Sequence, residues 1–315
     1  NLVRDSKEPE LIMDAEIEVL NQETEKNEII SVNLTILPLI NEDSDGRTDE
    51  KESFLGILLM IEDISSEKRM KSTMSRYMDP GIADQLLEDG ADIMGGLDTT
   101  ATLLFSDLRS FTNITESLGA QGTVKLLNEY FEIMVECISE QGGMLDKFIG
   151  DAIMAAFGLP ISHEDDEDRG VKAGINMIKR LWDWNDLREK DGKPPLDMGL
   201  GLNTDKIVAG NIGSQKRMDY TMIGDGVNLA ARLESACKQY NARILISDFT
   251  FKKLKGTYRI RYIDDVVVKG KTEPVGVHEV LDYHSEKTFP NLMDVVNHFN
   301  EGRKKYISGD FQQAI

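Results

Sequence analysis

The chain has 315 residues, with 36 Lys and Arg against 56 Asp and Glu, so its formal net charge is −20. This acidic balance disfavours a nucleic-acid interface and a general attraction to anionic membranes, but it leaves room for a local basic pocket that binds a phosphorylated small molecule. The longest apolar run, residues 55–61, is too short to span a bilayer, so we expect no membrane segment in this chain.

Cys137 and Cys237 are the only two cysteines in the sequence. So low a cysteine content predicts a reducing, cytoplasmic location and no disulfide framework. The chain begins at Asn1 rather than Met and ends within a helical pattern at Ile315. We therefore interpret it as a piece of a longer protein.

Within the N-terminal region, residues 1–65, a β-strand pattern covers residues 17–64. Apolar and polar side chains alternate over residues 30–36, which is the period of a half-buried strand. An acidic, turn-rich loop at 41–53 separates this strand from a second apolar run at 54–65. This order predicts a long hairpin.

A helix is predicted next, in a linker segment that covers residues 66–97. Met70, Met74 and Tyr77 recur at steps of three and four residues, and Pro80 ends the pattern. Two interpretations fit this helix. It is either a short parallel coiled-coil linker between two subunits, or a helix that packs on its own domain.

Residues 98–283 alternate between strand and helix patterns. We predict a strand, a long helix, a hairpin, a second long helix, a second hairpin, a strand–turn–helix unit and three late strands. These lie at residues 100–106, 115–143, 144–158, 167–192, 196–213, 218–240 and 242–283. Long helices mixed with several hairpins indicate an α+β sandwich rather than a strict βαβ sheet. A short helical stretch follows in residues 284–315.

Two aspartates stand at strand ends in this region. Asp107 follows the apolar strand 100–106, and Asp151 lies in the hairpin turn that starts at Gly150. If the two strands are neighbours, both carboxylates reach the same sheet edge, where they repel each other unless a proton or a metal lies between them. Mg²⁺ and Mn²⁺ prefer such oxygen ligands, and paired metals stabilise an in-line displacement. Taken singly, Asp107 also fits a helix N-cap and Asp151 ordinary turn chemistry.

A second cluster lies later in the chain. Asn228 and Arg232 are four residues apart on a predicted helix and so share a face, and the fork of an arginine suits phosphate oxygens. Lys269 and Lys271 lie at a strand end beside a glycine. Together these residues predict a polyphosphate site. Taken singly, Arg232 also fits a surface ion pair, and the two lysines fit a solvated turn.

Six motifs then occur in one order: LLFSDLRSFT, LLNEYF, DKFIGDAIMAAFG, GLNTDKIVAGNIGS, DYTMIGDGVNLAARLE and VVVKGKTEPV. Together they resemble the catalytic domain of class III nucleotide cyclases, of the bacterial adenylyl cyclase type, over residues 98–283. The resemblance implies a ferredoxin-like α+β core that acts as a dimer. It also implies conversion of a nucleoside triphosphate to the 3′,5′-cyclic monophosphate and pyrophosphate with two divalent metal ions, Mg²⁺ or Mn²⁺.

The resemblance assigns metal and catalytic roles to matching positions. It implies metal ligands at Asp107, Asp151 and the backbone carbonyl of Leu108. It implies that Asn228 and Arg232 are the catalytic pair, which positions the ribose and stabilises the transition state.

The resemblance also implies substrate contacts. Lys269 matches the lysine that contacts phosphate, and Lys147 matches the lysine that reads the purine, with Thr221 as its partner. Phe111 and Thr112 belong to the phosphate loop and are expected to contact the substrate.

Two positions depart from the family pattern. Thr221 stands where adenylyl cyclases often have Asp, but a hydroxyl can both donate and accept, so it can still accept from the adenine amino group. Guanylyl cyclases tend to carry Glu and Cys at the positions of Lys147 and Thr221, so this pair favours ATP. Ser110 stands where Gly is common, which bears on the geometry of the phosphate loop.

The flanking regions resemble other families over shorter stretches. Residues 1–65 resemble the last strands of a PAS sensor domain. Residues 284–315 resemble the start of a tetratricopeptide repeat (TPR), which implies a protein partner; a plain amphipathic helix is the alternative.

The sequence therefore predicts a cytoplasmic, homodimeric adenylyl cyclase that an upstream sensor regulates. One subunit would supply Asp107 and Asp151, and the other would supply Lys147, Thr221, Asn228, Arg232 and Lys269, in two equivalent sites. The alternatives are a guanylyl cyclase, a silent domain that only binds nucleotide or a partner, and a fragment that its linker helix holds inactive.

Overall fold

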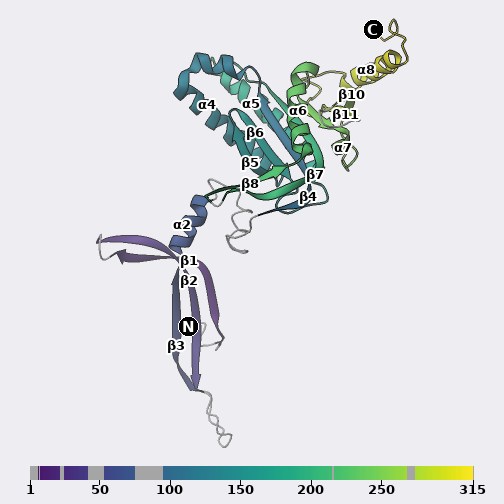
Figure 1. The fold of residues 1–315 in the computed structure, drawn as a ribbon. Coiled ribbons are helices and arrows are strands. Elements are labelled where there is room, and N and C mark those ends of the chain that lie inside the picture. The colour runs from purple at the N-terminus through teal and green to yellow at the C-terminus, as the bar shows by residue number, and fades with distance from the viewer. Residues whose placement is uncertain are drawn as a thin grey trace, which may run out of the picture. The chain divides into compact units, whose positions relative to one another are not determined.

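The computed structural model describes residues 6, 8–21, 25–41, 53–74, 95–214, 216–267 and 274–314. The chain divides into two compact units, Asn1–Ala83 and Asp84–Ile315 (Figure 1). Among the helices of the described residues, none is long and apolar enough to cross a membrane.

The first unit is a three-stranded antiparallel sheet followed by a helix. Its elements are β1 (Glu10–Asn21), β2 (Lys26–Asn41), β3 (Ser53–Asp63) and α2 (Ser65–Met74). The predicted hairpin is β2 and β3, and β1 is a further strand whose many acidic residues obscured its pattern. The rest of the predicted linker helix, including Tyr77 and Pro80, lies outside the described residues.

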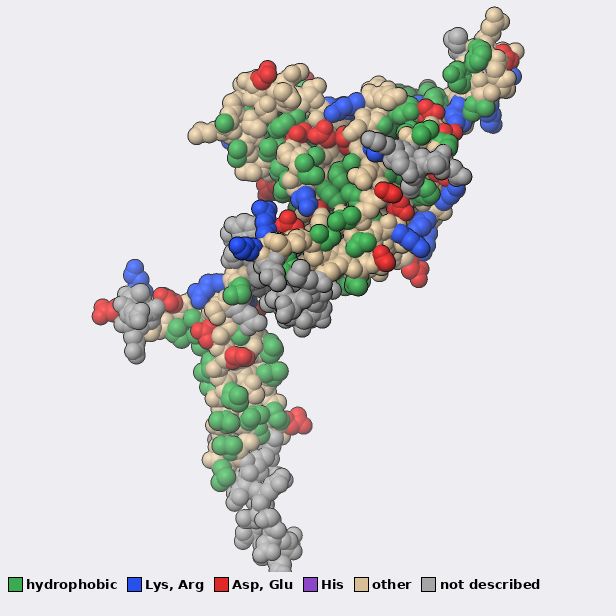
Figure 2. Space-filling model, viewed as in Figure 1, with side chains coloured by type: hydrophobic (Ala, Val, Ile, Leu, Met, Phe, Trp, Pro, Cys, Tyr) green, Lys and Arg blue, Asp and Glu red, His purple; other side chains and the backbone are tan. Residues whose placement is uncertain are grey.

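The sheet of the first unit has little core of its own among the described residues. Val32 is fully buried, whereas the exposed fractions of Leu55, Leu59 and Ile61 are 67%, 51% and 54%. Figure 2 shows hydrophobic side chains along the surface of this sheet. A sheet normally buries one face against a second layer, whereas much of the apolar surface of this sheet is exposed among the described residues. That agrees with the prediction of a partial PAS-like region, which stays a prediction.

The second unit is built on an eight-stranded mixed sheet in the order β10-β11-β9-β7-β4-β6-β5, with β8 paired to β7. Its strands are β4 (Gly95–Leu108), β5 (Met144–Ile149), β6 (Ala152–Phe157), β7 (Met198–Ser214), β8 (Arg217–Ile223), β9 (Ile244–Ser247), β10 (Ile260–Val266) and β11 (Val275–Val280). Its helices are α4 (Phe111–Glu140), α5 (Asp166–Lys190), α6 (Asp225–Tyr240), α7 (Asp248–Phe251) and α8 (Leu292–Ile307). This mixed sheet with flanking helices confirms the predicted α+β class.

Helices cover both faces of this sheet. Side chains along β7 alternate between the two faces, so neighbouring residues of this strand contact different helices. Leu200 and Leu202 point toward α5, where they lie within contact distance of Gly174 and Gly170. Gly199 and Gly201 face α6 instead. The main core therefore lies between the sheet and the long helices α4 and α5, and α6 packs on the opposite face.

The hairpin predicted over residues 196–213 is wrong, because the structure has one continuous strand there, β7. The residues that suggested a turn serve close packing. A Cβ on Gly201 would lie 2.2 Å from the backbone nitrogen of Glu234, so only glycine lets α6 approach this closely. The side chain of Asn203 donates to the carbonyl of Gly226 over 3.0 Å and is fully buried.

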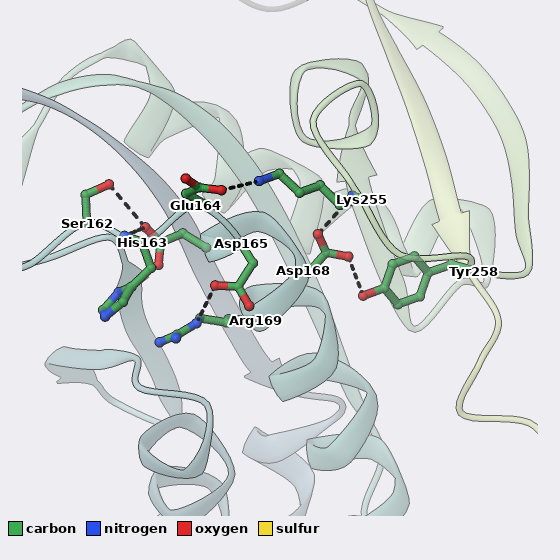
Figure 3. Close-up of polar contacts among 9 residues, drawn as sticks. Ser162, His163, Glu164, Asp165, Asp168, Arg169, Lys255 and Tyr258 are labelled. Carbon is green, nitrogen blue, oxygen red and sulfur yellow. Dashed lines mark hydrogen bonds and ion pairs between the residues drawn. The ribbon is translucent and has the colours of Figure 1, made fainter.

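A polar junction joins the start of α5 to the loop that follows α7 (Figure 3). Asp168, with an exposed fraction of 3%, accepts hydrogen bonds from the backbone nitrogens of Lys255 (2.9 Å) and Gly256 (2.8 Å) and from the hydroxyl of Tyr258 (2.8 Å). Burial by itself would raise the pKa of this carboxyl, but the three donated bonds outweigh it and lower the pKa below its usual value. Asp168 is therefore a structural carboxylate, and both of its oxygens accept hydrogen bonds.

Candidate active site

Two carboxylates meet at the edge of the sheet where β4 ends. β4 pairs with β6, with Ser106 opposite Ile153, so the end of β4 lies beside the turn that carries Asp151. The backbone nitrogen of Leu108 donates to Asp151 Oδ2 over 3.2 Å. The expected juxtaposition of Asp107 and Asp151 is therefore present, and it is made within one chain.

The electrostatics of this pair are unfavourable in the chain alone. Burial, followed by the neighbouring Asp107 carboxylate, raises the pKa of Asp151 to about 6. Glu234 on α6 adds a third acid nearby, and burial and then Asp107 raise its pKa too. For Glu234 the nearby charges of Lys238 and Arg109 lower the pKa, but burial and the Asp107 carboxylate outweigh them.

The residues at this edge fit a divalent cation. A cation between Asp107 and Asp151 would remove the repulsion that raises the pKa of Asp151, and oxygen ligands are those that Mg²⁺ prefers. Within the described residues no group of three or more His, Cys, Asp or Glu side chains gathers as a metal site. Two protein carboxylates suit a metal whose remaining ligands come from substrate phosphates and water.

Asp107 forms an ion pair with a lysine of α6. Lys238 of α6 places its Nζ 3.2 Å from Asp107 Oδ2. This contact was not predictable from the sequence, because Lys238 has the pattern of an ordinary solvated lysine in the last turn of a helix. Its side chain is 55% exposed, so the ion pair contributes little to stability, and a divalent cation can displace it.

Arg109 has a structural role beside the site. Its guanidinium lies 3.2 Å from Asp197 Oδ2 and donates to the backbone carbonyl of Ala242. Its backbone nitrogen also donates to the carbonyl of Asp197 over 2.8 Å. Arg109 therefore ties the end of β4 to the segments around β7 and β9, and its side chain is only 18% exposed.

The predicted phosphate loop forms the start of α4. Ser110 has φ 57° and ψ 28°, in the left-handed region that glycine adopts without strain. Glycine suits this position because it adopts the left-handed region freely, whereas Ser110 adopts it with backbone strain. Phe111 packs against the main core, and Thr112 is exposed in the first turn of α4. Both residues follow Asp107 by no more than five positions, so they lie just after the end of β4.

The two residues predicted to read the base come together around a third. Lys147 of β5 and Thr221 of β8 both approach Asp146, a residue that sequence reasoning did not single out. Lys147 Nζ lies 3.6 Å from Asp146 Oδ2, and Thr221 Oγ1 donates to the same oxygen over 3.4 Å. The only available signal was an acidic residue directly before a site lysine, inside a strand.

The predicted catalytic pair lies on α6. Asn228 and Arg232 are both exposed and four residues apart on this helix, as the spacing predicted. Lys269 and Lys271 lie outside the described residues, so their placement stays a prediction.

The family of the chain follows from its comparison with known proteins. Residues 97–284 match the family described as adenylate and guanylate cyclase catalytic domain, and the chain belongs to this family. It is 38% identical over 221 residues to the terminal-differentiation-specific adenylate cyclase of Dictyostelium discoideum, across 68% of this chain and 10% of that protein. It is 38% identical over 186 residues to an adenylate cyclase of Anabaena cylindrica, across 57% of this chain and 36% of that protein. The chain thus spans only a minor part of these relatives' length.

Solved structures of both nucleotide specificities share the fold. The adenylyl cyclase CyaB from P. aeruginosa matches with a TM-score of 0.56 and 35% identity, across 62% of this chain and all of that chain (100%). The guanylyl cyclase Cya2 matches with a TM-score of 0.53 and 39% identity, across 59% of this chain and 94% of that chain. Because both kinds match, the choice of nucleotide has to be argued from the site residues.

Proposed function

We propose that the chain is an adenylyl cyclase that converts ATP to 3′,5′-cyclic AMP and pyrophosphate. The observation that carries the proposal is the Asp107–Asp151 pair at the sheet edge of a cyclase fold. In this reaction the ribose 3′-oxygen forms a bond to the α-phosphorus, and its proton passes to solvent water. The bond from the α-phosphorus to the oxygen that bridges to the β-phosphorus breaks, and pyrophosphate leaves with those electrons.

Asp107, Asp151 and the carbonyl of Leu108 would hold two divalent cations, Mg²⁺ or Mn²⁺. When bound, these cations lower the pKa of the attacking hydroxyl and neutralise charge on the phosphates. The chain itself keeps the Asp151 carboxylate in place through the Leu108 N–H, and with a pKa of about 6 that carboxylate is ionised at neutral pH.

The remaining residues act on the substrate. Arg232 stabilises the charge that develops on the transferring phosphoryl group, and Asn228 positions the ribose. Lys269 binds phosphate, and Phe111 and Thr112 complete the phosphate loop. These roles rest on the matching motifs together with the exposed positions of Asn228 and Arg232 on α6.

We place the complete site between two copies of the chain. Apolar side chains at the ends of β5 and β8 are exposed, with fractions of 44% for Phe148, 52% for Ile149 and 54% for Ile223. A homodimer that buries them would bring Asp107 and Asp151 of one copy to Arg232 of the other. In that case a mixture of Asp107→Ala and Arg232→Ala proteins regains activity through one intact hybrid site. A mixture as inactive as its components contradicts a shared site.

Assay of the purified chain with ATP and GTP separately, each with Mn²⁺, tests the substrate. We expect cyclic AMP as the main product, since Lys147 and Thr221 favour adenine. A clear preference for GTP would make the chain a guanylyl cyclase. Binding of nucleotide without any turnover, in the presence of metal, would support the silent-domain alternative.

The flanking regions are proposed to regulate and connect this activity in the cytoplasm. An upstream sensor acts through residues 1–65 and the linker 66–97, and a protein partner binds the TPR-like segment 284–315. If the linker holds the fragment in an inactive state, removal of residues 1–97 raises its specific activity.

A further inference from the structure

The bulge in β5 gives Asp146 an unusual position. The pairing of β5 with β6 shifts register between Leu145 and Lys147, so Asp146 is an extra residue opposite no partner. Consecutive residues of a regular strand point to opposite faces, whereas a bulge re-aims them, and bulges are common beside active sites. The bulge explains how Asp146 and Lys147, adjacent in sequence, bring their charged groups within 3.6 Å of each other.

The environment of Asp146 is that of a buried acceptor. Its side chain has an exposed fraction of 0%. Among the described residues nothing donates to its Oδ1, and its Oδ2 faces Thr221 Oγ1 at 3.4 Å and Lys147 Nζ at 3.6 Å. A buried carboxylate lowers the stability of a fold unless it is paired, so its presence here points to a functional role. Burial raises the pKa of Asp146, and the nearby ammonium of Lys147 opposes that rise by favouring the carboxylate.

This contact decides the polarity of the Thr221 hydroxyl. A carboxylate only accepts hydrogen bonds, whereas a threonine hydroxyl has one proton to donate and two lone pairs. When that proton points to Asp146, Thr221 offers only lone pairs to the base. Lys147 offers only donors. The chain therefore presents one acceptor and one donor, side by side.

These two groups complement the edge of adenine and oppose that of guanine. Adenine has a 6-amino donor next to the N1 acceptor, whereas guanine has a 6-oxo acceptor next to an N1–H donor. We propose that Asp146 is a positioning residue that sets base specificity, because it holds the Thr221 hydroxyl as an acceptor and so selects ATP over GTP. The inference rests on the proposed adenylyl cyclase activity and assigns its specificity to a residue outside the matched roles.

Asp146→Asn tests this inference. The substitution keeps the shape but adds an amide that can donate, so the Thr221 hydroxyl is free to turn its proton toward guanine. We expect the ratio of kcat/KM for ATP to kcat/KM for GTP to fall about tenfold, the value of one hydrogen bond of ordinary strength. A residue with only a structural role would lower both kcat/KM values together and leave their ratio unchanged.

A double-mutant cycle makes the test specific. Thr221→Val removes the hydroxyl at constant shape and should lower the ratio by a similar factor. Asp146→Asn added to Thr221→Val should then leave the ratio unchanged, since no hydroxyl remains to orient. If Asp146→Asn does not yield folded protein, Asp146→Ser, which can also donate, takes its place in the cycle.

The matched control is Asp168→Asn, which changes an equally buried carboxylate that also accepts from a hydroxyl, that of Tyr258. Its ATP to GTP ratio should equal that of the unmodified chain. An unchanged ratio in Asp146→Asn, or a ratio that falls equally in the control, overturns the inference and leaves the proposed function intact. A preference of the unmodified chain for GTP overturns the proposed function instead.

Discussion

Asp151 is partly buried and Asp168 is buried in the same unit, and their pKa values move in opposite directions. Burial and the Asp107 carboxylate raise the pKa of Asp151 to about 6. Three donated hydrogen bonds lower the pKa of Asp168, against the effect of burial. Three donors reach Asp168, whereas Asp151 accepts from the backbone nitrogen of Leu108 over 3.2 Å and faces the like charge of Asp107.

Asp168 is thus a structural carboxylate, whereas the surroundings of Asp151 fit the metal ligand that we propose. Polar groups without sufficient partners cost stability, and proteins keep them where function requires it. Asp146 belongs with Asp151 in this respect, because its Oδ1 has no donor among the described residues. Asp146 and Asp151 lie at the proposed base-binding and metal positions, whereas Asp168 lies at a junction between elements.

The largest expected effect is on catalysis. Asp107→Asn removes a proposed metal ligand, and we expect kcat to fall about a thousandfold, because a catalytic metal supplies several kcal/mol to the transition state. Asp168→Asn, assayed in parallel at 25 °C, should keep its activity per folded molecule. Product formation with Mn²⁺ and ATP measures both. If the Asp107→Asn protein keeps more than a tenth of the normal activity, Asp107 is not a ligand of a catalytic metal.

The second effect is on stability, where we expect the substitution at Asp168 to cost more than a substitution at the proposed metal site. Asp168→Asn leaves at least one of the three donors without an acceptor, so the free energy of unfolding should fall by about 2 kcal/mol. Asp151→Asn removes a like charge beside Asp107 and should leave the metal-free protein at least as stable as the unmodified chain. Urea unfolding in the presence of a chelator measures both. If Asp151→Asn loses more free energy of unfolding than Asp168→Asn, the structural role assigned to Asp168 is wrong.

Metal addition and removal should distinguish the two sites further. A cation that binds only the folded chain stabilises it by about 1.4 kcal/mol when present at ten times its Kd. We expect Mn²⁺ to raise the Tm of the unmodified chain and of Asp168→Asn, and a chelator to reverse the rise. Asp151→Asn should show no such rise. An equal rise in all three proteins would place the metal elsewhere.

The smallest effect is the shape of the pH dependence. The folded pKa of Asp168 is lowered, so its contribution is present above its unfolded pKa of about 3.9 and is lost as the pH falls through the folded value. The folded pKa of Asp151 is raised to about 6, so its proton stabilises the metal-free fold at low pH, and this is lost as the pH rises from about 4 to 6. Relative to the unmodified chain, the deficit of Asp168→Asn should therefore shrink below pH 4. The relative stability of Asp151→Asn should rise between pH 4 and 6. Urea titrations across this range check both.

Much of the site was predictable because its residues stand at positions that strand pattern and motif both mark. Asp107 follows an apolar strand and Asp151 stands in a hairpin turn, so strand neighbourhood alone predicted their juxtaposition. Asn228 and Arg232 were placed by helical spacing. Arg109 and Lys238 were not predictable, because their partners, Asp197 and Asp107, are distant in sequence.

The hairpin wrongly predicted over residues 196–213 shows a second limit of sequence reasoning. Glycine in a strand marks either a turn or a close approach of another element, and only the packed helix distinguishes the two. Gly201 belongs to the second kind because α6 lies against it.

The sequence by itself determined the α+β class, the cyclase motifs and the identity of the carboxylates, because these depend on local periodicity and on residue type. Tertiary structure decided which acids are satisfied. Asp146, Asp151 and Asp168 are identical in chemistry, and nothing in their local sequence states how many donors reach them. That number depends on strand register, on a bulge in β5 and on a loop nearly 90 residues away from Asp168. The desolvation and hydrogen bonding that those contacts create set the charge of each acid.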